Sequence, residues 1–238
     1  MPGLLATHGW ELGPVVGRSA STVVRIGRRG DDVVAVKLPA NGGDPATASR
    51  LRREAAILGR FHHRHLLPCL GLLERGADGR ASERRVDDAK VDDANVDDAE
   101  VALLLPLARA GSVADLLHRC GPLPVDRALG LLDQLDEALD QVHRAGFAHG
   151  NVTTADLLFA DRRSIWLTGL SRAHAVDRRP VDRRPLGDPG GVDGRGRDRS
   201  GHTHDPAAAA AIGIELLTGT RPDDAVHAEQ LLATLPER

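Results

Sequence analysis

The sequence predicts an α+β protein in two parts, a β-rich part over residues 1–105 and a helical part over residues 106–238. Two observations favour this division. Between residues 10 and 39, short β-branched runs alternate with Gly and Asp, which is typical of antiparallel strands joined by turns. Further along, apolar residues recur every three or four positions, which is the spacing of amphipathic helices. A chain of 238 residues fits one domain or two tightly joined lobes.

The β-rich part is predicted to hold five strands and one helix. Three strands fall within residues 10–39, and two more are expected at Leu66–Leu73 and Val101–Leu105. Asp44 is predicted to cap a helix whose first residue is Pro45, a position where the missing N–H has no consequence. The apolar face of this helix and its end are marked by Leu51, Ala55, Leu58 and Gly59.

Residues 76–100 are predicted to form an acidic insert. Three tandem five-residue repeats fill residues 86–100, and their six Asp repel one another and offer little to bury. This segment is expected to be unstructured, as a solvated spacer or as an acidic arm that docks a partner or attracts cations. A second duplication, over residues 176–185, alternates in charge and is also expected to be unstructured.

The helical part is predicted to hold three helices. Ser112 caps a short helix that ends near Arg119, and a long helix covers residues 126–144 and stops before Gly146. Its buried face is expected to comprise Leu129, Leu132, Leu135, Leu139 and Val142. The third helix, Ala207–Leu217, is almost wholly apolar and is expected to be buried on all sides.

The composition excludes several classes of function. A net charge of −3 gives no bulk attraction to nucleic acid or to a membrane surface, and no apolar stretch is long enough to span a bilayer. Cys69 and Cys120 are too few for a disulfide framework and lack metal-ligand spacing. The N-terminus has no signal-peptide pattern. We therefore expect a cytoplasmic protein that binds neither nucleic acid nor membrane, while the oligomeric state stays open.

The most informative motif is a loop that follows the long predicted helix. His149, Gly150 and Asn151 open the loop, Asp156 follows, and a short strand then leads to Gly169. This order and spacing closely resemble the catalytic loop and metal-binding turn of the protein kinase family. In that family the loop reads His-Arg-Asp, four residues and Asn, and the turn reads Asp-Phe-Gly.

The resemblance covers residues 10–222 apart from the acidic insert. It implies a two-lobed protein-kinase-like fold, with a small antiparallel β lobe plus one helix and a larger helical lobe. The chain looks most like bacterial serine/threonine kinases. Aminoglycoside-type phosphotransferases share a similar loop, but the Thr-Gly-x-Arg-Pro turn at residues 218–222 favours the protein kinases. A full kinase lobe carries further helices after this turn, so we expect the helical lobe to be incomplete at its C-terminal end and to expose apolar surface.

The resemblance implies ATP as a cofactor. In the family a strand Lys neutralises the α- and β-phosphates and is held by a helix Glu; the matching residues are Lys37 and Glu54. Gly17 begins the loop that would cover the phosphates, although Ser19 and Thr22 replace its later glycines. The residues that match the adenine pocket are Val24 and Ala35 in its roof, Leu158 in its floor, Leu105 at the gatekeeper position, and Pro106 and Ala108 in the hinge.

The residues that would carry out phosphoryl transfer are altered. Asn151 stands at the position of the catalytic base, and a neutral amide cannot accept the hydroxyl proton. Gly169 offers no oxygen at the position of a Mg²⁺ ligand, and Thr153 replaces the Lys that steadies the transferred phosphate. Asp156 keeps one metal ligand, so the resemblance implies a weakened Mg²⁺ site. We therefore predict little or no phosphoryl transfer.

Three further matches concern structure and regulation. His149 and Asp205 match family positions that bind the backbone of the catalytic loop. Gly150 stands where an Arg would bind a phosphorylated activation segment. Residues 172–199 contain no Ser, Thr or Tyr, so phosphorylation within this segment is excluded.

Three interpretations stay open at this point. The first is a pseudokinase that regulates through a protein partner, with or without bound ATP. The second is a degenerate but active serine/threonine kinase that transfers phosphate with the help of Lys37 and Asp156. The third is a non-functional kinase relic.

Overall fold

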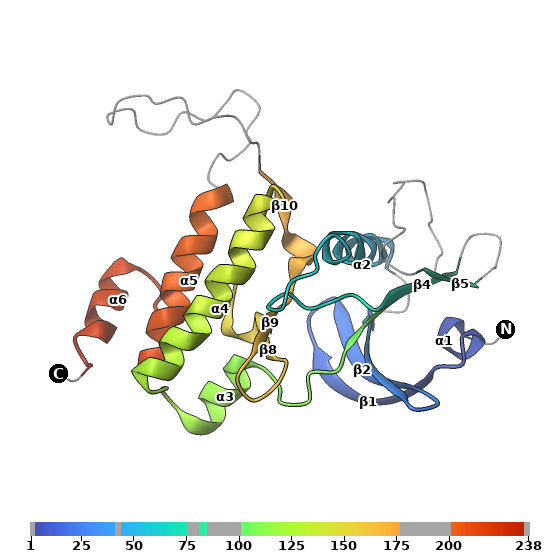
Figure 1. The fold of residues 1–238 in the computed structure, drawn as a ribbon, viewed down its shortest axis with the longest axis horizontal. Coiled ribbons are helices and arrows are strands. Elements are labelled where there is room, and N and C mark those ends of the chain that lie inside the picture. Colours follow the sequence, from blue (N-terminus) through green and yellow to red (C-terminus); the bar gives the residue numbers. More distant parts are fainter. Residues whose placement is uncertain (1–2, 41–43, 76–80, 85–100, 177–200, 236–238) are drawn as a thin grey trace. The chain divides into compact units, whose positions relative to one another are not determined.

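The computed structural model describes residues 3–40, 44–75, 81–84, 101–176 and 201–235. The chain divides into two compact units (Figure 1). The first comprises residues 1–111 and 158–171, and the second comprises residues 112–157 and 172–238. This division differs from the predicted boundary after residue 105 in two ways: the first unit continues to residue 111, and the chain returns to it for residues 158–171.

The first unit is built on a six-stranded antiparallel sheet, and its α+β character agrees with the predicted fold class. The strand order is β1-β2-β3-β6-β4-β5. The bounds are β1 (Glu11–Arg18), β2 (Thr22–Arg29), β3 (Asp32–Pro39), β4 (Gly71–Arg75), β5 (Ala81–Arg84) and β6 (Val101–Pro106). The three strands predicted between residues 10 and 39 are confirmed.

The fourth strand begins later than predicted. Leu66 lies outside the sheet and forms an isolated parallel bridge with Leu167, where the Leu67 N–H donates to the Leu167 carbonyl over 3.0 Å. β4 therefore starts only at Gly71. β5, at residues 81–84, lies within the predicted insert and was not predicted as a strand. The acidic repeats at 86–100 and nearly all of the duplication at 176–185 lie outside the described residues.

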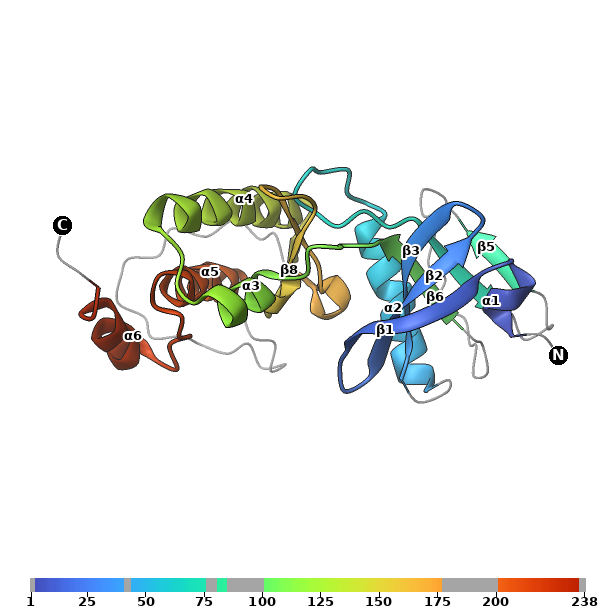
Figure 2. The ribbon, with the colours of Figure 1, turned by 90° about the horizontal axis from the view of Figure 1, so that it is seen from below.

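Helix α2 (Pro45–Leu58) confirms the predicted helix and covers one face of the sheet (Figures 1 and 2). The Asp44 carboxylate accepts hydrogen bonds from the Ala46 and Thr47 N–H groups, which would otherwise lack a partner at the start of the helix. A short helix, α1 (Leu4–Thr7), precedes the sheet. Its Leu4 packs into a core that also contains Trp10, Val36, Leu73 and Leu104.

Gly27 in β2 is required by close packing within this core. A Cβ atom at this position would lie 2.5 Å from Val36 Cγ2 and 3.2 Å from Val34 Cγ2. Val36 is fully buried, so it has no room to withdraw. We expect Gly27→Ala to lower the free energy of unfolding by about 1–3 kcal/mol, the usual cost of overpacking, as measured by urea denaturation.

Gly13, in the neighbouring strand β1, provides a matched control. A Cβ atom there would lie 3.5 Å from Ile26 Cβ, which is an ordinary van der Waals contact. Gly13→Ala is therefore expected to leave the urea midpoint within the range of surface substitutions. Equal midpoints for the two variants would contradict the packing argument.

The second unit is helical. Its helices are α3 (Val113–Cys120), α4 (Val125–Arg144), α5 (Gly201–Thr218) and α6 (Ala225–Leu232). The predicted cap at Ser112 is confirmed, with a capping box in which Ser112 Oγ accepts from the Asp115 N–H and the Asp115 carboxylate accepts from the Ser112 N–H. Two short strands, β7 (Phe147–Ala148) and β10 (His174–Ala175), pair antiparallel beside the end of α4. Helix α6 was not predicted.

Two burial predictions for these helices are wrong. Leu129 is 53% exposed, because the buried face of α4 is centred on Ala128, Leu131, Leu135 and Leu139. Helix α5 is not buried on all sides: it lies against α4 through one face (Figures 1 and 2), while Ala207 and Ala210 are exposed. Over residues 205–218 of α5, where burial is described, the buried residues are Asp205, Ala209, Ile212, Gly213 and Leu216. In the described part of the chain, no helix is long and apolar enough to cross a membrane.

Candidate nucleotide site and catalytic loop

The predicted ion pair between Lys37 and Glu54 is present in the first unit. Lys37 Nζ lies 2.7 Å from Glu54 Oε2 and 2.9 Å from Oε1, so both carboxylate oxygens accept from the ammonium group. The Glu54 side chain is completely buried, and the Lys37 side chain is 15% exposed. A buried carboxylate is stable only with a partner, so this pair fixes the contact between β3 and α2.

Strand register aligns most of the other predicted nucleotide residues with Lys37. Gly17 of β1 is paired with Val24 of β2, and Val24 is paired with Lys37 of β3. Ala35, two residues before Lys37, is paired with Leu105 of β6. Pro106 ends β6, and Ala108 lies just beyond it. The antiparallel order of the sheet therefore gathers residues from four separate strands in one neighbourhood.

The turn between β1 and β2 is closed by hydrogen bonds between its own residues. The Ser19 N–H donates to the Thr22 carbonyl over 2.8 Å, and the Thr22 N–H donates to Ser19 Oγ over 3.0 Å. The two hydroxyl groups also lie 2.8 Å apart and share a hydrogen bond. Ser19 and Thr22 therefore use within the turn the donors that a phosphate would need.

The segment that carries Leu158 and Gly169 joins the first unit as a hairpin. Strand β8 (Leu157–Phe159) pairs with β9 (Ile165–Leu167), and the Phe159 N–H donates to the Gly111 carbonyl over 2.9 Å. Leu158 is half-buried in this hairpin, and no strand register links it to the sheet that carries Lys37. Gly169 follows with φ +84°, a conformation that favours glycine.

The loop that resembles the catalytic loop of kinases belongs to the second unit. Asn151 is exposed, and Asp156 ends a single 3₁₀ turn over Thr154–Asp156. Asp156 Oδ2 accepts from the Thr153 N–H over 3.0 Å and from Thr153 Oγ1 over 2.7 Å. One oxygen of the only carboxylate in this loop is thus used in a local cap. Among the described residues, no group of three His, Cys, Asp or Glu side chains could hold a metal ion.

Asp205 of α5 anchors the loop backbone, as the resemblance implied. Asp205 Oδ2 accepts from the His149 N–H over 2.7 Å, and Oδ1 accepts from the Gly150 N–H over 2.8 Å. His143 Nε2 lies 2.8 Å from the same Oδ2. Burial alone would raise the pKa of Asp205, but the hydrogen bonds from His143, Gly150 and His149 together lower it below its ordinary value.

A second anchor of the loop was not predicted. Thr154 Oγ1 donates to Glu215 Oε1 over 3.0 Å, and Arg221 donates to Glu215 Oε2 over 3.4 Å. Arg221 also donates to the Val152 carbonyl over 3.1 Å. Glu215 and Arg221 both lie in the stretch that matched the kinase helix and turn, but the sequence pattern gives no sign that they reach back to the loop.

Gly150 adopts φ +81°, and a Cβ atom there would lie 3.1 Å from the ring of His174 in β10. The Arg that many kinases carry at this position would therefore meet both backbone strain and a close neighbour. The remainder of the segment after β10, residues 177–200, lies outside the described residues.

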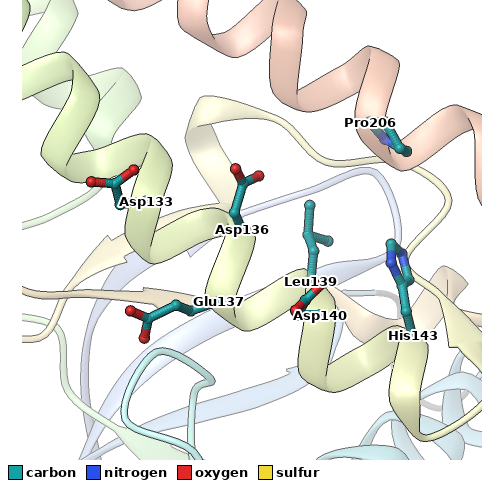
Figure 3. Close-up of a pocket in the computed structure, with 7 residues that line it drawn as sticks. All are labelled: Asp133, Asp136, Glu137, Leu139, Asp140, His143 and Pro206. Atoms are coloured by element: carbon teal, nitrogen blue, oxygen red, sulfur yellow. The ribbon is translucent and has the colours of Figure 1, made fainter.

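A hollow of about 550 Å³ lies between α4 and α5 (Figure 3). It is lined by Asp133, Asp136, Glu137, Leu139, Asp140, His143 and Pro206. Burial raises the pKa of Asp136, and the charges of Asp133 and Asp140 add to the effect. None of the predicted nucleotide or catalytic residues lines this hollow.

Comparison with known proteins supports the kinase resemblance. The chain is 26% identical over 162 residues to human testis-specific serine/threonine-protein kinase 3, an alignment that covers 66% of this chain and 53% of the kinase. It is 28% identical over 211 residues to serine/threonine-protein kinase PknA of Mycobacterium tuberculosis, covering 83% of this chain and 42% of the kinase. The chain thus spans about half or less of the length of these relatives. No family model matches.

The sequence comparison and the structure both support the resemblance to protein kinases. The alignment to PknA extends over most of the chain, and the structure shows the sheet, the Lys37–Glu54 pair and the loop held by Asp205. On these grounds the chain is similar to serine/threonine protein kinases in both sequence and fold.

Proposed function

We propose that this domain is a pseudokinase that binds ATP through its first unit and transfers phosphate weakly or not at all. The observation that carries the proposal is a contrast between two parts of the chain. The Lys37–Glu54 ion pair is assembled at 2.7 Å, whereas Asn151 and Gly169 replace the base and the metal ligand. Nucleotide affinity and chemistry depend on different residues, so one can be kept while the other is lost.

The burial of the ion pair supports a nucleotide role. An ion pair buried to this extent costs desolvation energy and adds little net stability, so stability alone does not account for it. Lys37 is one of only two lysines in the chain, although arginines are abundant. A compact ammonium group held at a fixed place by Glu54 is suited to neutralise phosphate oxygens.

The residues at the metal positions fit Mg²⁺ poorly. Gly169 has no side-chain oxygen, and one carboxylate oxygen of Asp156 already accepts hydrogen bonds from Thr153. Mg²⁺ in kinases bridges phosphate oxygens and carboxylate or amide ligands and neutralises charge during transfer. We therefore propose that ATP binds through Lys37 without a requirement for Mg²⁺.

The rival function, an active serine/threonine kinase, rests on Asp156. A carboxylate in this loop could supply one metal ligand through Oδ1. The hydrogen bonds of Oδ2 with Thr153 resemble a helix cap, which is a structural use of the side chain. The cap favours the pseudokinase over the active enzyme.

A domain with little transfer activity would act through a protein partner. Helix α6 presents Val226 and Leu232, which are 64% and 44% exposed. Exposed apolar side chains of this kind are compatible with a contact surface. We propose that this surface of α6 contacts a protein partner.

The test is thermal unfolding in the presence of ATP, with and without Mg²⁺. ATP at a hundred times its dissociation constant should stabilise the wild type by about 2.7 kcal/mol, which corresponds to a rise in Tm of several degrees. The shift should be the same without Mg²⁺. It should disappear in the double variant Lys37→Met/Glu54→Gln, which removes both charges and leaves no unpaired buried carboxylate.

The control is Arg28→Ala, which removes an exposed positive charge from the same sheet. This variant should keep the full ATP shift. A wild-type protein that unfolds cooperatively and shows no shift with ATP would exclude nucleotide binding. A shift that requires Mg²⁺ would instead favour the active kinase.

A further inference from the structure

Within the described residues, two ion pairs tie helix α2 to the sheet. Glu54 binds Lys37 of β3, as described above, and Arg52 binds Glu74 of β4, with 2.6 Å between Arg52 Nε and Glu74 Oε1. The Arg52 and Glu74 side chains are 17% and 15% exposed, so this second pair is also largely removed from water.

The two pairs act on opposite sides of the helix. Residues 52 and 54 are separated by about 200° around the axis of an α-helix, so their side chains leave in different directions. In the sheet, β6 lies between β3 and β4, and α2 packs on β6. The helix is therefore tethered to the strands on both sides of the strand that it covers.

Apolar packing and the ion pairs hold α2 in different ways. The buried apolar side chains are Ala48, Leu51, Ala55, Ile57 and Leu58, and they hold the helix against the sheet. Apolar burial is non-directional, whereas a hydrogen bond between charged groups requires a particular distance and angle. The two ion pairs therefore add directional contacts on either side of the apolar face.

The Arg52–Glu74 pair is a poor device for stability alone. Arg52 Nη2 is buried and has no hydrogen-bond partner within the described part of the chain. A buried nitrogen without a partner carries a desolvation cost that offsets much of the gain from the ion pair. The geometry is better explained by a role in setting the position of the helix.

We propose that Arg52 and Glu74 are positioning residues that hold α2 in the rotation at which Glu54 binds Lys37. Through Glu54, the pair fixes the ammonium group of Lys37 for the phosphates of the nucleotide. The effect on phosphate binding rests on the proposed nucleotide binding. The effect of Arg52 and Glu74 on the Lys37–Glu54 pair can be tested without any nucleotide.

The first test measures the reactivity of Lys37 toward an acetylating N-hydroxysuccinimide ester under native conditions. Lys37 and Lys90 are the only lysines, so peptide mass spectrometry can report the acetylation of Lys37 relative to Lys90. Glu74→Gln and Arg52→Met should raise this ratio at least fivefold, because Lys37 Nζ would no longer be held against the two carboxylate oxygens of Glu54 and would be open to the reagent.

Two variants serve as controls for this test. Glu74→Asp keeps a carboxylate near Arg52 without adding a lysine and should keep a ratio close to that of the wild type. Glu83→Gln removes a different ion pair of the same sheet, with Arg29 at 3.0 Å, and should leave the ratio unchanged. Unchanged acetylation in Glu74→Gln and Arg52→Met, even with a lower Tm, would overturn the proposal.

The second test compares the affinities for ATP and for adenosine by calorimetry. In the proposed nucleotide site Lys37 binds the phosphates and not the base, so Glu74→Gln should weaken ATP binding at least fivefold and adenosine binding less than twofold. A wild type that binds no ATP would refute the proposed function, while the acetylation ratio would still decide the role of the pair. Normal ATP affinity in a variant with reactive Lys37 would overturn the link to the nucleotide.

Discussion

Asp205→Asn is expected to lower the free energy of unfolding by about 2–4 kcal/mol, which is the range for a buried charged group that loses its hydrogen bonds. Both carboxylate oxygens of Asp205 face donors: the N–H groups of His149 and Gly150, and the ring of His143. An asparagine in either orientation would point its NH₂ group at one of these donors. The catalytic-loop backbone would lose at least one anchor.

Asp140→Asn is the matched control in the same unit. Asp140 forms an ion pair with Arg144 at 2.9 Å, but these side chains are 65% and 74% exposed. Exposed pairs of this kind contribute about 0.2–1 kcal/mol, so the control should unfold close to the wild type in urea. A similar midpoint for Asp205→Asn and Asp140→Asn would contradict the anchoring role of Asp205.

The effect of Asp205→Asn should also depend on pH. The pKa of Asp205 in the folded protein is below its ordinary value of about 3.9. The unfolded chain therefore binds its proton at a higher pH than the folded chain, and the stabilisation is complete above about pH 5. As the pH falls through the folded pKa, the difference between wild type and variant should shrink. A difference that grows on acidification would contradict the assigned ionisation.

The elements that the sequence predicted well are those whose ends carry local chemistry. Asp44 followed by Pro45 begins a helix, and Ser112 with Asp115 forms a capping box, because these side chains satisfy N–H groups a few residues away. Leu129 was placed on the wrong face of α4 because helical spacing alone does not say which of several overlapping apolar stripes will meet a neighbour.

In the candidate site, contacts between residues far apart in the sequence were predicted only where a known motif named both partners. The Lys37–Glu54 pair was predicted because a resemblance supplied both partners. Arg52–Glu74 spans 22 positions and Thr154–Glu215 spans 61, and no motif connected them. The self-closed turn at Ser19 and Thr22 was missed for a different reason. Their hydroxyl groups suit either a phosphate or each other, and only the turn geometry decides between the two.

The largest effect on activity is expected from restoring two residues together. Wild-type protein should show no ATP-dependent phosphate transfer to a generic protein substrate above background. The double variant Asn151→Asp/Gly169→Asp should exceed wild type by at least about 100-fold, the lower range for a positioned general base. Each single variant should stay near background, because base and metal ligand act as a unit and their effects are not additive.

The local structure tolerates both substitutions. Asn151 is exposed, so a carboxylate there remains solvated and carries no burial cost. Gly169 has φ +84°, and Asp is among the residues that adopt this region more readily than others, at a cost of roughly 1–2 kcal/mol. Asn151→Asp/Gly169→Asn is the matched control: it accepts the same backbone strain but supplies no carboxylate at the metal position.

The outcome would separate the interpretations that concern chemistry from those that concern the fold. If the double variant transfers phosphate, and loses this activity when Lys37→Met/Glu54→Gln is added, the scaffold still positions ATP and the residues at 151 and 169 alone account for the inactivity of the wild type. A cooperatively folded double variant that binds ATP yet remains inactive would place the defect elsewhere. We would then expect the defect to lie in the Ser19–Thr22 turn. Its Ser19 and Thr22 N–H groups are hydrogen-bonded within the turn and are not free to bind the phosphates.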